Sequence, residues 1–189
     1  MYSLFACYKV FADKTYDYFF QQPKPTNSIE RLYKPNTYCE YIYHFLNQYS
    51  FFFSDPTHII DNIYLGSAYN AASFYTLKDL NIKKIINVTQ EISQYYSEDF
   101  EYKTYKLYDN NFDDISDFLD DAYNYINNTT DNILVHCYMG SSRSATIIVY
   151  YLMKKYNMSL DESINFVRTK RNIVNLTTKF KNELDNIPK

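Results

Sequence analysis

The chain of 189 residues has no tryptophan, only two glycines and only three cysteines. The cysteines, Cys7, Cys39 and Cys137, are odd in number and lack the spacing of a disulfide framework. They therefore favour a reducing compartment in which a thiol stays free. Because glycine is so scarce, we expect Gly66 and Gly140 where the backbone needs a positive φ or a close approach by another group.

Further absences exclude whole classes of protein. The formal net charge is −3, so no excess of positive charge indicates a nucleic-acid partner. No apolar run reaches the ~18 residues of a membrane span, and the N-terminus lacks the pattern of a secretory signal. No cluster of histidine, cysteine and aspartate has metal-ligand spacing. The sequence thus predicts a cytoplasmic protein with no nucleic-acid partner, no membrane span and no cofactor.

Residues 1–54 differ in composition from the rest of the chain. They are rich in tyrosine and phenylalanine, and they end in Phe51-Phe52-Phe53 before Asp55-Pro56. Disordered chains are poor in aromatic residues. We therefore interpret this stretch as an N-terminal extension that packs its aromatic side chains on the following domain. The alternatives are a dimer contact, which would make the protein a homodimer, and a segment that docks on a partner or on a membrane surface.

Residues 55–189 have the pattern of one α/β domain. Short apolar or alternating runs predict strands at 63–65, 82–88, 102–108 and 133–136. Helical periodicity and capping residues predict helices from Ser67 to about Leu80, over 115–127 and 144–156, from Ser159 to about Lys170, and from near Thr177. Alternation of strands and helices indicates a central, twisted, mainly parallel sheet of about four to five strands, flanked by helices.

The most informative stretch is His136-Cys137-Tyr138-Met139-Gly140-Ser141-Ser142-Arg143-Ser144. It lies between an apolar strand and a helix that is apolar nearly all round. A loop of this length that closes onto a helix N-terminus can turn its backbone N–H groups inward and form a nest for an oxyanion. Arg143 adds a planar fork that can grip two phosphate oxygens, and the same positive field would favour the thiolate of Cys137.

This stretch resembles the signature of the cysteine-dependent protein tyrosine phosphatases, and its Ser-Arg-Ser ending resembles the dual-specificity (VH1-like) branch. The resemblance covers about residues 58–187. Ile63-Tyr64-Leu65-Gly66 is similar to the first strand and turn of the family, and residues 85–89 are similar to its second strand. Before the last helix the family often carries Pro-Asn, where this chain has Val174-Asn175. The resemblance implies a protein phosphatase that hydrolyses phosphotyrosine and phosphoserine/threonine through a phosphocysteine intermediate.

The resemblance also implies roles for the residues of this stretch. Cys137 would be the nucleophile, and Arg143 would bind phosphate oxygens. The hydroxyl of Ser144 would help the sulfur to leave, although this serine could equally be a helix N-cap. His136 would support the loop. The backbone from Tyr138 through Met139, Gly140 and Ser141 to Ser142 would complete the phosphate-binding nest.

A general acid must protonate the leaving oxygen. The candidates before the 115–127 helix are Asp109, Asp113, Asp114 and Asp117. In the dual-specificity family the acid directly follows a strand about thirty residues before the cysteine, which favours Asp109. Asp113 or Asp114 would instead begin the next helix, where acidic side chains are favourable.

Three alternative functions remain open from the sequence. An RNA 5′-triphosphatase or a lipid phosphatase could use the same scaffold, although the acidic net charge and the uncharged side chains of Tyr138, Met139 and Ser141 count against both. A module that binds phosphoproteins without turnover is the third alternative. The joint presence of Cys137, Arg143 and a candidate acid disfavours it.

Overall fold

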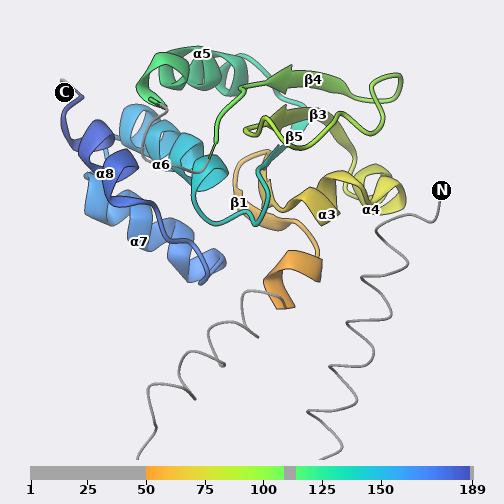
Figure 1. The fold of residues 1–189 in the computed structure, drawn as a ribbon, viewed down its shortest axis with the longest axis horizontal. Helices are drawn as coiled ribbons and strands as arrows, with labels where there is room; N and C mark the ends of the chain where they lie inside the picture. The colour runs from red at the N-terminus through yellow and green to blue at the C-terminus, as the bar shows by residue number, and fades with distance from the viewer. Residues whose placement is uncertain (1–49, 109–113, 188–189) are drawn as a thin grey trace, which may run out of the picture. The chain divides into compact units, whose positions relative to one another are not determined.

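The computed structural model describes residues 50–108 and 114–187 (Figure 1). All of the described residues belong to one compact unit of the chain. Most of the predicted extension, with Cys7 and Cys39, lies outside the described residues, as do Asp109 and Asp113. The predicted boundary between residues 54 and 55 stays a prediction.

A five-stranded sheet forms the centre of the fold, in the order β1-β2-β5-β3-β4. The strands are β1 (Thr57–Ile60), β2 (Ile63–Gly66), β3 (Ile82–Asn87), β4 (Glu101–Thr104) and β5 (Asn132–His136). Only β1 runs antiparallel to its neighbour. The predicted mainly parallel α/β sheet is therefore confirmed.

The predicted strand over 102–108 is too long at its end. After β4 ends at Thr104, the amide of Tyr105 still donates to the carbonyl of Asn87, at 2.8 Å. Two residues later the carbonyl of Leu107 accepts from the Arg143 side chain instead, at 2.9 Å. The chain therefore leaves the sheet and turns toward the loop that follows β5.

Helices cover both faces of the sheet (Figure 1). They are α3 (Ala68–Ala71), α4 (Phe74–Asp79), α5 (Ser116–Asn127), α6 (Arg143–Tyr156), α7 (Leu160–Lys170) and α8 (Thr178–Asp185). The larger apolar core joins one face of the sheet to α5, α6, α7 and α8. A smaller core packs α3 and α4, with Phe100, on the other face. The predicted helices from 115, 144, 159 and 177 are confirmed to within about two residues.

The single helix predicted from Ser67 to Leu80 is wrong, because the structure has α3 and α4 in its place. Ser67 is the N-cap that the sequence predicts, in a capping box with Asn70. The break comes at Ser73, whose hydroxyl donates to the carbonyl of Tyr69 at 2.8 Å. Such local hydrogen bonds from serine compete with the helical ladder.

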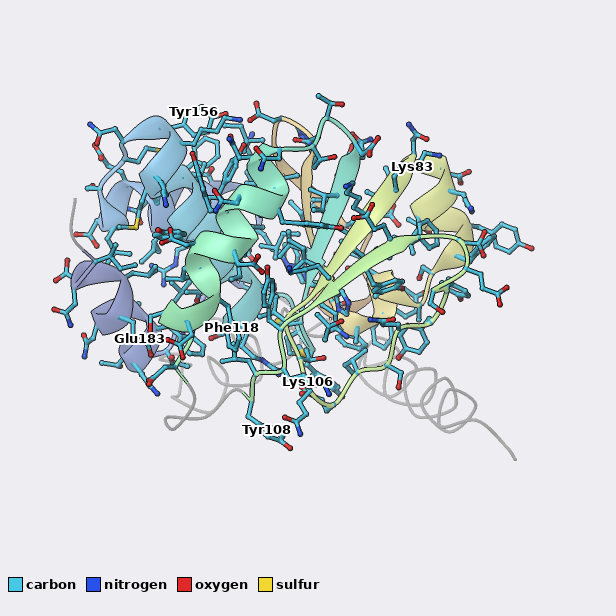
Figure 2. All side chains as sticks on the ribbon, turned by 90° about the horizontal axis from the view of Figure 1, so that it is seen from above. Lys83, Lys106, Tyr108, Phe118, Tyr156 and Glu183 are labelled. Carbon is cyan, nitrogen blue, oxygen red and sulfur yellow. The ribbon has the colours of Figure 1, made fainter. Side chains whose placement is uncertain are left out.

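The N-terminus of α5 is capped by α8 rather than by its own residues. The carboxylate of Glu183 accepts from the amides of Ile115 and Ser116, at 2.8 and 3.0 Å. Asp114 pairs with Lys179 of α8 at 2.8 Å. Figure 2 places Glu183 and Phe118 at this same end of the domain. The chain after residue 113 is thus fixed against α8.

Candidate active site

The loop after β5 leaves the middle of the sheet at its carboxyl edge. His136, the last residue of β5, is in register with Gly66 of β2 and Asn87 of β3. In open parallel sheets this edge is where ligands bind. Residues 137–142 form the loop, called the catalytic loop below, and α6 begins directly after it at Arg143.

Cys137 is buried, with 2% of its surface exposed, and its sulfur is the focus of the catalytic loop. The amide of Gly140 donates to Sγ at 3.3 Å, and the hydroxyl of Ser144 donates to it at 3.2 Å. Donors that converge on one atom favour its negatively charged form. The sulfur of Cys137 accepts from one backbone donor and one side-chain donor.

The two glycines of the chain lie against each other where this loop meets the end of β2. Gly140 has φ +71°, and a Cβ added to it would lie 2.7 Å from the carbonyl carbon of Gly66 and still closer to its oxygen. A Cβ on Gly66 would lie 2.8 Å from a methyl group of Leu134. As expected, both glycines lie where another group approaches the backbone closely, and Gly140 also has a positive φ.

Arg143 is buried in spite of its charge, and its guanidinium is held by a carboxylate. Its Nη2 lies 2.8 Å from Oε1 of Glu91, and its Nη1 donates to Oε2 of Glu91 at 3.0 Å. Nη1 also donates to the carbonyl of Leu107 at 2.9 Å. Burial would raise the pKa of Glu91, but the hydrogen bonds and charge of Arg143 outweigh it and lower the pKa. Sequence analysis missed Glu91, although its place just after β3, next to β5, was a usable signal.

His136 directly precedes Cys137 and is fully buried. Its Nδ1 lies 3.3 Å from the carbonyl oxygen of Cys137, which is compatible with the predicted supporting role. Burial lowers the pKa of His136 to about 4, so the imidazole is neutral at neutral pH. A charged histidine is therefore not available here as an acid.

Ser144 is not a helix N-cap, because α6 begins at Arg143 and the N-cap position belongs to Ser142. Its hydroxyl is thus free of capping and reaches the sulfur of Cys137. On the other side of the catalytic loop, the carbonyl of Tyr138 accepts from the amide of Ala68 at 3.0 Å, and that of Ser141 accepts from the amide of Asn175 at 2.9 Å. Asn175 therefore contacts the loop through its backbone.

One tyrosine of the catalytic loop and one of the segment after β4 have exposed side chains. Tyr138 is 43% exposed and Tyr108 is 46% exposed. Figure 2 shows Tyr108 and Lys106 on the segment that leaves β4, at the margin of the domain. Asp109, the predicted acid, directly follows Tyr108 and lies outside the described residues.

A second buried arginine, Arg171, contacts the catalytic loop from behind. Its Nε donates to the carbonyl of Gly140 at 2.9 Å, and its Nη2 donates to the carbonyl of Met139 at 3.0 Å. Sequence analysis missed it, because nothing in its local sequence distinguishes it from the other cations near the end of α7.

Within the described residues, no group of three histidine, cysteine, aspartate or glutamate side chains could hold a metal ion. No described helix is long and apolar enough to cross a membrane.

Comparison with known proteins identifies the family. Residues 63–188 match the family model described as dual specificity phosphatase, catalytic domain. The chain therefore belongs to the dual-specificity phosphatases, in agreement with the resemblance of its cysteine loop.

Curated relatives share about a third of their residues with this chain. Protein phosphatase Slingshot of Drosophila melanogaster is 33% identical over 133 residues, which cover 69% of this chain and 13% of that protein. Dual specificity protein phosphatase 1 of Mus musculus is 36% identical over 132 residues, which cover 68% of this chain and 36% of that protein. The chain thus matches only a minor part of the length of these relatives.

A solved structure agrees on the fold. The human tyrosine phosphatase-like serine/threonine/tyrosine-interacting protein superposes with a TM-score of 0.67 at 23% identity, over 69% of this chain and 93% of that one.

Proposed function

We propose that this chain is a protein phosphatase that hydrolyses phosphotyrosine and phosphoserine/threonine through a phosphocysteine intermediate. The observation that carries the proposal is the sulfur of Cys137, buried at the N-terminus of α6 and approached by donors from Gly140 and Ser144. Membership of the dual-specificity family supports the same reaction.

In the first step the Cys137 thiolate attacks phosphorus in line with the ester oxygen. The S–P bond forms as the P–O bond breaks. The inward amides of the catalytic loop and the guanidinium of Arg143 bind the non-bridging oxygens, where charge is spread in the transition state. A planar guanidinium suits this task because it can donate to two oxygens at once.

Asp109 is proposed as the acid that protonates the leaving oxygen. Leu107 supports this role, because its carbonyl binds Arg143 and so brings the chain to the guanidinium two residues before Asp109. The rival candidate Asp114 is engaged by Lys179. In the second step Asp109 takes a proton from water, water attacks phosphorus, and the S–P bond breaks. The hydroxyl of Ser144 stabilises the departing thiolate.

A phosphoprotein is the proposed substrate class. The side chains that the catalytic loop presents at Tyr138, Met139 and Ser141 carry no positive charge, whereas a polyphosphate or an inositol phosphate headgroup would be favoured by added cations. The cytoplasmic location is part of the proposal, since a reducing compartment keeps the free thiol of Cys137 reactive. A homodimer formed through residues 1–54 stays a prediction.

The test is a parallel assay of the full chain on a phosphotyrosine peptide, a phosphothreonine peptide, a phosphoinositide and a 5′-triphosphate RNA. We expect turnover of both peptides and none above background of the other two. The control is Cys137→Ser, which should abolish turnover and keep oxyanion binding. Preferential hydrolysis of the lipid or the RNA would replace this function with one of its rivals. Peptide binding without turnover would indicate a binding module.

A further inference from the structure

We propose that Arg171 is a positioning residue, which joins the backbone of the catalytic loop to the N-terminal turn of residues 50–54 and holds the loop in its oxyanion-binding shape. The effect on turnover rests on the proposed function above. The effect on loop geometry does not, because oxyanion binding reports it without any reaction.

The first argument is the orientation of one peptide group. In a trans peptide the C=O and N–H groups point in opposite directions. The carbonyl of Met139 accepts from Arg171 at 3.0 Å, while the amide of the same peptide group, that of Gly140, donates to the sulfur of Cys137 at 3.3 Å. Arg171 therefore fixes the direction in which this amide points. It does the same for the next peptide group by binding the carbonyl of Gly140 at 2.9 Å.

The second argument is the link to the N-terminal turn. Nη2 of Arg171 also donates to the carbonyl of Phe51 at 3.1 Å, and its guanidinium carbon lies 5.4 Å from the centre of the Phe51 ring. Nη1 donates to the hydroxyl of Thr57 at 3.2 Å. One side chain thus binds the catalytic loop, the turn and β1 together.

The turn itself is fastened to the domain at two further points. The hydroxyl of Ser67 donates to the carbonyl of Phe52 at 2.7 Å, and the side-chain Nδ2 of Asn70 donates to the carbonyl of Ser54 at 2.6 Å. The ring of Phe52 also lies 5.7 Å, centre to centre, from that of Tyr138 in the catalytic loop. The turn is therefore a fixed support on which Arg171 can hold the loop.

The third argument is charge. Arg171 is fully buried, and no carboxylate of the described residues pairs with it. Burial lowers the pKa of Arg171 to about 10, an effect that the charge of Cys137 opposes, so the guanidinium is cationic at neutral pH. A buried cation without a carboxylate partner is costly for stability. We attribute its place behind the loop to the negative charge of the oxyanion that the loop is proposed to bind.

The test compares Arg171→Met, which removes both fork and charge, with Arg171→Lys, which keeps the charge alone. Lys170→Met is the matched control, because this exposed cation is the neighbour of Arg171 at the end of α7. All variants are made in the full chain and measured below their melting temperatures. Tungstate affinity, measured in a Cys137→Ser background, reports the shape of the nest. The pH midpoint of Cys137 alkylation by iodoacetate reports the charge.

We expect Arg171→Met to weaken tungstate binding about tenfold or more and to raise the pH midpoint of alkylation. Arg171→Lys should also weaken tungstate binding, by at least threefold, while its alkylation midpoint stays near that of the wild type. Lys170→Met should change neither. If Arg171→Lys binds tungstate as tightly as the wild type, the proposal is overturned. This holds even if Arg171→Met fails to fold. A wild type that binds tungstate but hydrolyses no phosphate would refute the proposed function and leave this inference standing.

Discussion

The catalytic loop lies between two buried arginines with different partners. Arg143, at the start of α6, is gripped by the carboxylate of Glu91 and by the carbonyl of Leu107. Arg171, after the last residue of α7, has only neutral acceptors among the described residues, and two of them are carbonyls of the loop itself.

This difference in partners indicates which arginine can bind a ligand. Four of the five N–H groups of Arg171 donate to protein oxygens, and the side chain is fully buried. The partner of Arg143 is a carboxylate that is itself 37% exposed, at the open edge of the sheet. We therefore expect Arg143 to act on the substrate and Arg171 to act on the loop.

The sharpest test of this division is Arg143→Ala. We expect kcat/KM for an aryl phosphate to fall about 10³-fold or more, because the charge of the transition state loses its main donor. Arg143→Lys should recover little, since an ammonium cannot bind two oxygens in one plane. The control is Arg168→Ala, whose side chain binds the carbonyl of Val174 and not the catalytic loop. If kcat/KM of Arg143→Ala stayed within tenfold of the wild-type value, groups other than Arg143 would bind the phosphate oxygens.

Gly140→Ala tests the space between the loop and the sheet. The new methyl group would meet the carbonyl of Gly66 at a positive φ. We expect the free energy of unfolding to fall by about 3 kcal/mol, measured by denaturant titration. Ser141→Ala, the neighbouring change, should cost less than about 0.5 kcal/mol. Equal stability of the two variants would contradict the close contact between the glycines.

The pH dependence of stability tests the burial of His136. His136 has a pKa of about 4 in the folded protein, below its value of 6.5 in an unfolded chain. Between these values the unfolded state binds more protons, so stability falls as the pH is lowered. From pH 7 to pH 5 the loss from this group should be about 2 kcal/mol. In His136→Asn the loss of stability between pH 7 and pH 5, measured by denaturant titration at each pH, should be smaller by about 2 kcal/mol.

Glu91→Gln should have the smallest effect. The neutral side chain no longer aligns the guanidinium of Arg143 by charge, so we expect kcat to fall about tenfold with KM unchanged or lower. The control is Glu98→Gln, at an exposed carboxylate in the segment between β3 and β4 that also contains Glu91. This variant should behave as the wild type. A raised KM at constant kcat would mean that Glu91 contributes to binding the substrate instead of aligning Arg143.

The sequence predicted those parts that depend on neighbours along the chain. The strand, loop and helix around Cys137 and Arg143 follow from local apolar patterns and the spacing between the two residues. The scarcity of glycine singled out Gly66 and Gly140, although their mutual contact could not be foreseen. Local patterns failed at the break between α3 and α4, where the Ser73 hydroxyl competes with the helical ladder. They also failed at the early end of β4, where the distant Arg143 binds the carbonyl of Leu107.

The tertiary structure alone decided the surroundings of the loop. Glu91 is 52 residues from Arg143 in the chain, and Arg171 is 31 residues from Gly140. A hydrogen bond over such separations exists only after the sheet has aligned its carboxyl edge and α7 has packed beneath it. The sequence by itself therefore determined which residues we expect to form the oxyanion nest. The packing of the elements determined which groups hold its backbone and balance its charge, because those groups meet only in the folded chain.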